Sequence, residues 1–476
     1  MLLRTLYDDK LAQASYLIGC QSTGQALIID PNRDAQQYVR AARREGLRIT
    51  HVAETHIHAD FVSGSRELAH ATGATMCLSA EGGRDWQYAF ADQPNVVLLR
   101  DGDVFRIGNI RVQVMHTPGH TPEHICFLIT DTSSAEQPMG ICSGDFVFVG
   151  DVGRPDLLEK AAGVAGAMQE GAQQLYQSLE RFRELPDYLQ VWPGHGAGSA
   201  CGKALGAVPQ TTVGYEKLFS PAFAFSTEPE FVDYILSGQP EPPRYFATMK
   251  RINREGPPIA GGLRVPPEIV DAQELLRILR EGMTVVDTRD ARAFGRGHVH
   301  GVINIPYNRA FTTWAGSLLS YDAPFALIAE ERVIAEMARD LALIGLDDVA
   351  GYVALSRIAP FATETLSSID TDHMNELVGR ADAVVLDVRG LAEWQEGHVP
   401  GARHIPIGEI TERSDELPRS KRIVVHCQTG SRAAIASSVL QARGFDVVNV
   451  HGGFEQWRAS GRPIEWVAAA DALVER

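Results

Sequence analysis

The C-terminal half of the chain repeats one pattern of residues at an offset of about 100 positions. Val285–Arg289 (VVDTR) corresponds to Val385–Arg389 (VLDVR), and Gly297–Gly301 (GHVHG) corresponds to Gly397–Gly401 (GHVPG). An offset of this size is that of a whole domain and not of a solenoid repeat. Each copy alternates short apolar runs with helical patterns, which is typical of a parallel sheet flanked by helices. We therefore expect two related α/β domains with parallel sheets in this half.

Length and composition limit the number of domains and the class of partner. At 476 residues the chain is too long for one hydrophobic core and suggests roughly three domains. Hydrophobic residues make up 45% of the chain and charged residues 22%, as in ordinary globular proteins. The 60 Asp and Glu residues outnumber the 44 Lys and Arg residues, which leaves a net charge of -16. This acidity excludes general nucleic-acid binding, although local arginines can still hold a small anionic substrate.

The sequence contains no signal for export or for membrane insertion. No apolar run approaches the length of a membrane span, and Met1–Lys10 lacks the apolar region of a signal peptide. The six cysteines are scattered without CxxC pairs, which argues against a disulfide framework and against a thiolate zinc site. We therefore expect a cytoplasmic protein that does not bind a membrane.

The N-terminal half alternates short apolar runs with helical patterns. This alternation predicts layered sheets with helices outside them. A Pro-rich stretch at Gln239–Pro243, followed by further proline pairs, predicts a linker at residues 241–262. Strands are expected at residues 26–30, 49–55, 96–99, 110–115, 125–129 and 139–143, and a helix at residues 35–45.

A histidine-rich segment, Thr55–Asp60 (THIHAD), ends one of these predicted strands. Its two imidazoles and one carboxylate suit a divalent metal ion or the residues around one. Three further segments follow in order, His116–Thr121 (HTPGHT), Ser143–Asp145 (SGD) and Trp192–Gly196 (WPGHG). Each lies at the end of a predicted strand, where loops gather on one face of a sheet. The sequence therefore predicts a metal site built from these loops.

The order of these motifs closely resembles the metallo-β-lactamase superfamily over residues 1–240, in particular the branch that contains glyoxalase II and the persulfide dioxygenases. The resemblance implies an αββα sandwich. The dinuclear hydrolases of this branch need a further histidine directly after the Asp of the first motif, and this chain has Phe61 there. Because an apolar ring cannot bind a metal, we expect a single ion.

The resemblance also implies which residues bind that ion. In the persulfide dioxygenases one Fe(II) is held by two histidines and one aspartate, which correspond here to His56, His120 and Asp145. Two imidazoles and a carboxylate on one face leave positions open for O2 and a thiolate together. We therefore expect a mononuclear Fe(II) cofactor.

The remaining polar residues of the motifs are expected close to the ion. His58, Asp60 and His195 are expected around the ligands or in the substrate pocket. The glutathione-dependent members follow the last histidine with Asp-Tyr, whereas here it opens a Gly-rich loop at residues 196–202 (GAGSACG). In this the chain resembles the multidomain bacterial persulfide dioxygenase–sulfurtransferases. The loop could cradle a different thiol carrier or a phosphate-bearing group.

Two further residues near these motifs have alternative roles. Cys201, on the Gly-rich loop, either carries a persulfide or is a buried structural thiol. Arg154, in Gly153–Asp156 (GRPD), also matches this branch and either contacts the substrate, the role we favour, or pairs with an acid. A part for Cys20 in the chemistry is equally open.

The segment Ile423–Ala433 (IVVHCQTGSRA) predicts a strand, a short loop that starts at Cys427, and a helix. Loop N–H groups and the helix N-terminus favour an anion at the centre, which activates Cys427 as a nucleophile. Arg432 is expected to bind an oxyanion such as sulfite or thiosulfate through its guanidinium fork. With the motifs of the second copy, this segment resembles a rhodanese domain over residues 367–476. Related phosphatases use a longer loop between Cys and Arg, so the spacing favours sulfur over phosphate.

The first copy of the repeat lacks the nucleophilic cysteine. Its corresponding segment, Phe325–Arg332 (FALIAEER), contains no cysteine, and none occurs between Cys201 and Cys427. Without a thiolate it cannot hold a persulfide, so residues 263–362 are expected to be an inactive scaffold. Its Asp287 and Arg289 are expected to make internal contacts of the fold.

Together these resemblances imply one pathway. A low-molecular-weight thiol persulfide is expected to react with O2 at the Fe(II) site and to give sulfite and the free thiol. Cys427 is expected to form thiosulfate from sulfite, or to use thiosulfate, and the direction is open. The thiol carrier, whether glutathione, coenzyme A or another, is open as well. The family resemblance also implies a homo-oligomer, a dimer or a tetramer.

Two other functions are compatible with the sequence. A glyoxalase II-like thioester hydrolase, fused to a sulfurtransferase, would use a zinc-activated water, and Phe61 argues against it. A non-catalytic persulfide carrier or sensor would only receive sulfur on Cys427, and the complete metal set argues against that.

Overall fold

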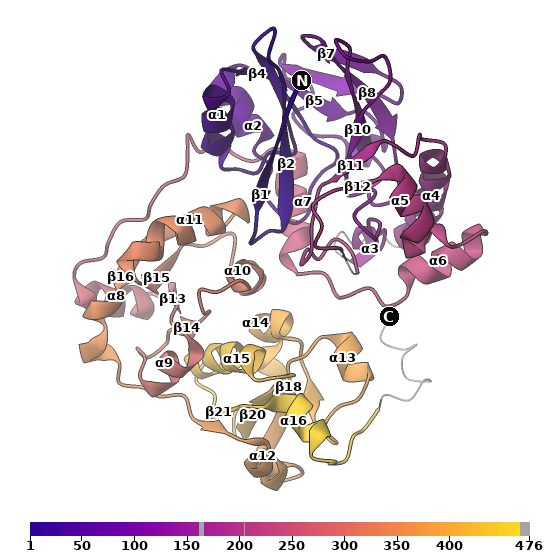
Figure 1. Ribbon diagram of the computed structural model, residues 1–476. Coiled ribbons are helices and arrows are strands. Elements are labelled where there is room, and N and C mark those ends of the chain that lie inside the picture. Colours follow the sequence, from indigo (N-terminus) through magenta and orange to yellow (C-terminus); the bar gives the residue numbers. More distant parts are fainter. Residues whose placement is uncertain (161–165, 204, 467–476) are drawn as a thin grey trace. The chain divides into compact units, whose positions relative to one another are not determined.

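The computed structural model describes residues 1–160, 166–203 and 205–466 (Figure 1). The chain forms two compact units, one of Met1–Leu263 with Ala342–Gly345 and one of Arg264–Leu341 with Leu346–Arg476. The finer division into domains at residues 240, 262 and 362 stays a prediction, and residues 467–476 of the last predicted domain lie outside the described part. Within that part, no helix combines the length and the apolar character that a bilayer span requires.

The described strands of the first unit form two sheets of six strands each. In the first sheet the two N-terminal pairs are antiparallel and the other pairs are parallel. In spatial order the first sheet contains β1 (Leu2–Asp8), β2 (Gln13–Cys20), β3 (Gln25–Ile29), β4 (Arg48–Ala53), β5 (Thr75–Ser79) and β6 (Val96–Leu99), and the second contains β12 (Thr211–Thr212), β11 (Gln190–Pro193), β10 (Gly140–Gly144), β9 (Ile125–Asp131), β8 (Ile110–His116) and β7 (Val104–Ile107).

The two sheets pack face to face and helices cover their outer faces. Successive side chains of a strand point to opposite faces, so Tyr16 and Ile18 pack against the second sheet while Leu17 packs against Tyr38 of α1. Figure 1 shows α1 and α2 beside the first sheet and α4 beside the second, which confirms the predicted αββα sandwich. The helices are α1 (Ala35–Arg44), α2 (Ser65–Thr72), the 3-10 helix η1 (Arg84–Trp86), α3 (Leu157–Lys160), α4 (Ala167–Arg183), α5 (Val213–Phe219), α6 (Glu228–Leu236) and α7 (Tyr245–Glu255).

The segment predicted to be a linker contains a helix. Residues 241–262 include α7, whose Phe246, Met249 and Asn253 are buried in the first unit. The prolines that flank this segment are typical of a linker. The linker prediction therefore missed the short amphipathic helix that lies between them. The strands predicted in the first unit agree with the structure to within two residues at each end.

The second unit contains a separate parallel sheet for each copy of the repeat. Each described strand pair in it is parallel, as the sequence predicts. Both copies also use the same strand order, because β14-β13-β15-β16 corresponds to β19-β18-β20-β21 with β17 added. The strands are β13 (Thr284–Asp287), β14 (Ile303–Asn304), β15 (Phe325–Ala329), β16 (Val349–Ala354), β17 (Ser368–Ile369), β18 (Ala383–Asp387), β19 (Arg403–His404), β20 (Arg422–His426) and β21 (Val447–Val450).

The repeated Asp-x-Arg motif makes the same contacts in both copies. Arg289 Nη2 donates to Asp287 Oδ2 at 2.6 Å and to the carbonyl of Gly297 at 2.9 Å. Arg389 Nη2 donates to Asp387 Oδ2 at 2.7 Å and to a matching glycine carbonyl at 2.8 Å. The predicted internal contacts of Asp287 and Arg289 are therefore confirmed. The helices of this unit are α8 (Ala272–Arg280), α9 (Ala291–Arg296), α10 (Phe311–Leu318), α11 (Ile334–Leu343), α12 (Thr371–Leu377), α13 (Leu391–Gln395), α14 (Ile410–Arg413), α15 (Ser431–Ala442) and α16 (Gly453–Ala459).

Candidate metal centre and sulfur-transfer loop

His56, His120 and Asp145 come together at the ends of three strands. They follow β4, β8 and β10, and one ligand atom of each lies within 4.8 Å of the others. The Nε2 atoms of His56 and His120 lie 4.0 and 3.6 Å from Asp145 Oδ2. All three residues are buried, with at most 3% exposure. The structure thus brings together the three residues that the sequence analysis proposed as ligands.

The donor atoms of this group are suited to a divalent cation. His56 Nδ1 donates to Thr55 Oγ1 at 2.9 Å and His120 Nδ1 donates to the carbonyl of Arg154 at 3.1 Å, which leaves each Nε2 with a free lone pair. Burial, reinforced by the charge of Lys250, lowers the pKa of His120 to about 3, so the imidazole is neutral, as a metal ligand must be.

The carboxylate of Asp145 supports the same conclusion. Neither oxygen accepts a hydrogen bond from the described residues. Burial raises the pKa of this carboxyl above its usual range, although the nearby imidazole of His195 opposes the shift. A buried carboxylate that accepts no hydrogen bond is destabilising. A bound cation would remove that destabilisation, so the residues present fit a metal ion.

Asp60, His195 and Cys201 form a second group whose ligand atoms lie within 4.8 Å of one another. His195 Nε2 lies 3.2 Å from Asp60 Oδ2 and 3.4 Å from Asp145 Oδ1, so the two groups adjoin. Burial raises the pKa of the Cys201 thiol well above its usual range. Phe61 supplies no donor, yet this group offers three without it. The expectation of a single ion therefore stays a prediction.

His58 is held by Asp30 and does not join either group of donors. Its Nε2 lies 3.2 Å from Asp30 Oδ1, and Asp30 also accepts hydrogen bonds from Thr55 N at 2.7 Å and Thr55 Oγ1 at 2.9 Å. Burial alone would lower the pKa of His58, but the carboxylate of Asp30 outweighs it and raises the pKa to about 9. The contact with Asp30 therefore fixes the orientation of His58 in the metal loop. The sequence analysis missed Asp30, which ends a strand and stands outside any histidine motif.

Arg154 pairs with an acid, the alternative to the substrate contact that the sequence analysis favoured. Its guanidinium is fully buried and donates to both carboxylate oxygens of Asp156, at 2.7 and 2.6 Å. It also donates to the carbonyl of Ala200 at 3.1 Å. These partners occupy its N–H groups in this structure, so Arg154 fixes the Gly-rich loop beside Cys201. A contact between Arg154 and the substrate stays a prediction.

Two residues of the run that follows His120 also position the centre. The backbone N–H of Asp145 donates to His124 Nε2 at 3.1 Å, and the N–H of Ile57 donates to Glu123 Oε1 at 2.9 Å. Both side chains are fully buried. The sequence analysis missed them, although the recurrence of Thr-Pro-x-His over residues 117–124 was a signal.

Helix α7 brings two more residues to the metal loop. Asn253 donates to the carbonyls of His58 and Phe61 at 2.8 and 2.7 Å and accepts from Ser63 N at 2.8 Å. One turn earlier, Lys250 is also buried. Burial lowers the pKa of Lys250 to about 8, and the charge of Glu123 opposes the shift. Sequence reasoning missed both because they lie within the predicted linker.

Replacing Asn253 with alanine should destabilise the first unit. The change leaves two buried carbonyls and one N–H without a partner, at a cost of about 2–4 kcal/mol in unfolding free energy. Urea unfolding followed by circular dichroism measures this loss, and metal retention should fall with it. Arg251→Ala, an exposed position on the same helix, is the control. Equal unfolding midpoints for the two variants would contradict the bracing role of Asn253.

Cys427 directly follows β20 and lies at the start of the loop that leads into α15. Its Sγ accepts a hydrogen bond from the N–H of Gly430 at 3.1 Å and is 1% exposed. Gly430 has φ of 109°, a conformation that favours glycine and directs its N–H toward the sulfur. The N–H of Gly430, directly before α15, therefore gives Cys427 a donor of the kind that a sulfur anion needs.

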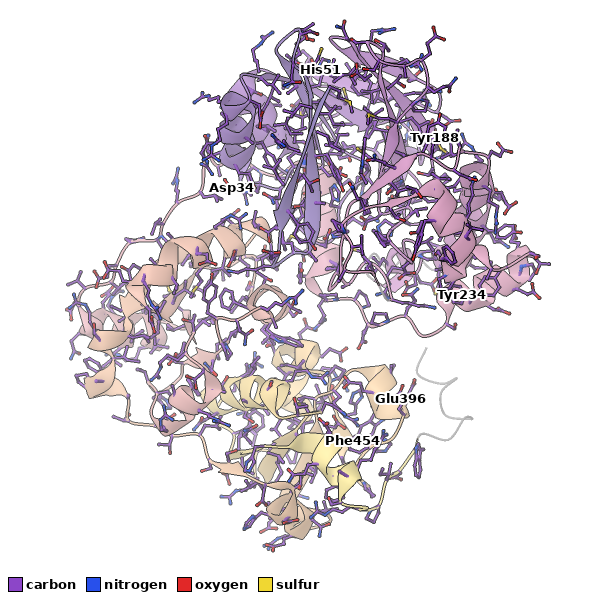
Figure 2. The ribbon with its side chains drawn as sticks, in the orientation of Figure 1. Asp34, His51, Tyr188, Tyr234, Glu396 and Phe454 are labelled. Carbon is purple, nitrogen blue, oxygen red and sulfur yellow. The ribbon has the colours of Figure 1, made fainter. Side chains whose placement is uncertain are left out.

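Arg432 is paired with a carboxylate in this structure. The sequence analysis expected its fork to bind an oxyanion, but Nη1 and Nη2 donate to the two oxygens of Glu393 at 2.5 and 2.7 Å. A carboxylate matches the fork as an oxyanion does, so Glu393 occupies that position. Arg389, which the sequence analysis left out of the site, donates to Gln428 Oε1 at 3.4 Å, and its Cζ lies 3.9 Å from the ring centroid of Phe454. Phe454 is labelled in Figure 2.

The comparisons with known proteins cover both sites. Residues 8–195 match the family model of the metallo-beta-lactamase superfamily, and residues 370–460 match that of the rhodanese-like domain. A solved metallo-beta-lactamase from Staphylococcus aureus subsp. aureus COL is 44% identical with a TM-score of 0.67, over 74% of this chain and 99% of that one.

The curated relatives each match less than half of the chain. The hydroxyacylglutathione hydrolase of Polaromonas sp. (strain JS666) is 35% identical over 38% of this chain, and the persulfide dioxygenase ETHE1 of Bos taurus is 27% identical over 49%. The match spans 61% of the length of that hydrolase and 79% of that dioxygenase.

Proposed function

The chain belongs to the metallo-β-lactamase superfamily and carries a rhodanese-like domain, and on this premise we propose that it is an iron(II) persulfide dioxygenase coupled to a sulfurtransferase. The observation that carries the proposal is the buried set of His56, His120 and Asp145 in one chain with the cysteine loop of Cys427. The resemblance to persulfide dioxygenases supports the choice of substrate.

The proposed oxidation converts a thiol persulfide, O2 and water into sulfite and the free thiol. Iron(II), when bound, would supply the site at which O2 and the persulfide sulfur meet and exchange electrons. The terminal sulfur is oxidised to sulfite, O2 is fully reduced, and the S–S bond of the persulfide breaks with the thiol as leaving group. His56 and His120 remain neutral through their Nδ1–H contacts, and burial of the three ligands excludes bulk water.

The proposed transfer step takes place at Cys427. A sulfane sulfur bound to Sγ would be attacked by sulfite, so that its bond to Sγ breaks and a new S–S bond forms thiosulfate. The N–H of Gly430 would stabilise the departing thiolate, and the reverse direction uses the same contacts. The first copy of the repeat, residues 263–362, has no cysteine and in this proposal serves as an inactive scaffold.

We also propose a cellular compartment and an oligomeric state for the protein. We expect a reducing compartment, the cytoplasm, and all six cysteines are free thiols, which supports it. A homo-oligomer, dimer or tetramer, is part of the same proposal.

A thioester hydrolase of the hydroxyacylglutathione hydrolase type is the second candidate. The group of Asp60, His195 and Cys201 favours it, because a second metal beside the first would suit a hydrolase with two ions. Relatives with this name match the chain at 32–35% identity, although only over 60–61% of their length.

Parallel assays of the iron(II) and zinc(II) forms distinguish the two functions. The persulfide dioxygenase proposal expects oxygen uptake by the iron form with glutathione persulfide or coenzyme A persulfide, and little hydrolysis of a hydroxyacylglutathione by either form. Rapid thioester hydrolysis by the zinc form, without oxygen uptake by the iron form, would replace the proposal with the hydrolase.

Replacing Glu393 with glutamine should strengthen thiosulfate binding at the Cys427 loop. The neutral amide no longer competes for Arg432, which becomes free to bind the anion, so KM for thiosulfate should fall about tenfold. A sulfurtransferase assay with cyanide as acceptor measures it. Glu409→Gln breaks a comparable pair with Arg413 on α14 and is the control. A rise in KM for Glu393→Gln would mean that Glu393 orients Arg432 for the anion.

A further inference from the structure

Lys250 is a buried cation without a hydrogen-bonding partner in the described part of the chain. Its Nζ lies 3.9 Å over the ring of Trp86, and the side chain is 8% exposed. An ammonium group has three N–H donors, and the face of an aromatic ring accepts none of them as an oxygen would. Glu123 interacts with this charge at longer range, since no ion pair joins the two residues among those described. Because Nζ itself reaches solvent, an acceptor from outside the protein can bind to it.

The position of Lys250 relative to the metal loop is fixed. Asn253, three residues along α7, holds the loop that carries His58 and Phe61. The segment after Trp86 is tied to the same helix, because Ala89 N donates to the carbonyl of Arg254 at 2.8 Å. Lys250 and Trp86 therefore stand as a rigid pair beside the proposed metal centre.

The charge of the surroundings gives this cation a role in binding an anionic ligand. Asp60, Asp145 and Glu123 are buried carboxyl groups at or beside the centre, and the whole chain carries a net charge of -16. An anion that approaches this site meets repulsion unless a cation offsets it. The guanidinium of Arg154 does not offset these carboxyl groups, because it is already paired with Asp156.

We propose that Lys250 and Trp86 bind the anionic group, a carboxylate or a phosphate, of the thiol that carries the sulfur to the metal centre. The ammonium donates to the anion's oxygens, and the indole face packs against the apolar part of the carrier. This inference rests on the proposed function and narrows its substrate to persulfides of anionic thiols. Glutathione presents carboxylates and coenzyme A presents phosphates, whereas 2-mercaptoethanol presents neither.

Binding of the carrier thiols themselves tests the inference without any reaction. Isothermal titration of the full-length, metal-loaded protein with glutathione and with coenzyme A should give measurable binding of at least one, and none of 2-mercaptoethanol. Lys250→Met should weaken that binding about 10- to 100-fold, and Lys250→Arg should retain most of it. Binding of glutathione assigns a carboxylate and binding of coenzyme A assigns a phosphate. Lys217→Met, which removes a lysine held by Leu185 and Asp187, is the matched control.

Equal affinity of the wild type and Lys250→Met for the bound carrier would overturn the inference, as would failure of the wild type to bind either carrier. Trp86→Leu provides a second variant should Lys250→Met melt at a lower temperature, and unchanged affinity in it would also count against the pair. Turnover separates this inference from the proposed function. Lys250→Met should raise KM for the persulfide of the bound carrier by a larger factor than KM for 2-mercaptoethanol persulfide, which has no anionic group for the ammonium to bind. If the wild type takes up no oxygen but binds the thiol, and Lys250→Met binds it less tightly, the dioxygenase proposal is wrong and the inference about Lys250 still holds.

Discussion

Replacing His120 with alanine is expected to remove the metal from the centre and to lower kcat/KM for the persulfide by at least about 100-fold. The imidazole supplies one of three ligand atoms, and its Nε2 lies 3.6 Å from Asp145 Oδ2 in the absence of an ion. The two remaining donors are too few to keep iron(II) bound in competition with water. They also do not fix the ion where O2 and a sulfur anion can both bind to it. Elemental analysis of the purified variant, together with oxygen uptake, measures both effects.

His70→Ala is the matched control for this variant. His70 is an exposed histidine on α2, outside the motifs, so metal content and oxygen uptake should equal those of the wild type. Full metal content in His120→Ala would contradict the assignment. The ion would then be held elsewhere, with Asp60, His195 and Cys201 as the next set of donors to test.

Replacing Cys427 with serine is expected to lower sulfur transfer between thiosulfate and an acceptor by more than about 1000-fold. A serine hydroxyl cannot hold a sulfane sulfur, and the Gly430 N–H that now points at Sγ would stabilise no leaving thiolate. Oxygen uptake with a persulfide should stay near the wild-type value, because the proposed metal centre lies in the other unit of the chain. Sulfite should then accumulate in place of thiosulfate.

Cys20→Ser is the matched control for the transfer step. Burial opposes ionisation of Cys20, but hydrogen bonds from Ser22 and Thr23 outweigh it and lower the pKa of the thiol to about 7. Cys20 is therefore a readily ionised thiol outside the loop of Cys427, and its removal should leave sulfur transfer intact. Mass spectrometry after incubation with thiosulfate should find one added sulfur atom on Cys427. Retained transfer in Cys427→Ser, or the added sulfur on Cys20, would contradict the assignment.

The fold and the centre of the metal site could be predicted because both depend on short-range patterns. His56 and His120 each follow an apolar run that forms a strand, and strand ends bring their loops to one edge of the sandwich. The loop of Cys427 is likewise local, since strand, loop and helix are consecutive in the chain. The repeat in the second unit preserved even the Asp-x-Arg contact, so its two sheets could be expected from the motif alone.

The residues that sequence reasoning missed or misjudged depend on long-range packing. Lys250 and Asn253 reach the metal loop because α7 packs in the first unit, and the prolines around it are typical of a linker. Arg154 lies among substrate-site motifs, but Asp156 is two residues away and occupies its fork. The position of Glu393 opposite Arg432 likewise depends on a contact between α13 and α15, which no local pattern indicates.

Oxygen consumption by the anaerobically prepared iron(II) form, measured against sulfite plus thiosulfate formed from glutathione persulfide or coenzyme A persulfide, is the most direct test of the central claim. Persulfide oxidation at His56, His120 and Asp145 predicts one O2 consumed for each sulfite or thiosulfate produced, and loss of both in His120→Ala. No oxygen uptake with either persulfide, while the zinc(II) form cleaves a hydroxyacylglutathione, would contradict the dioxygenase and assign the centre to hydrolysis.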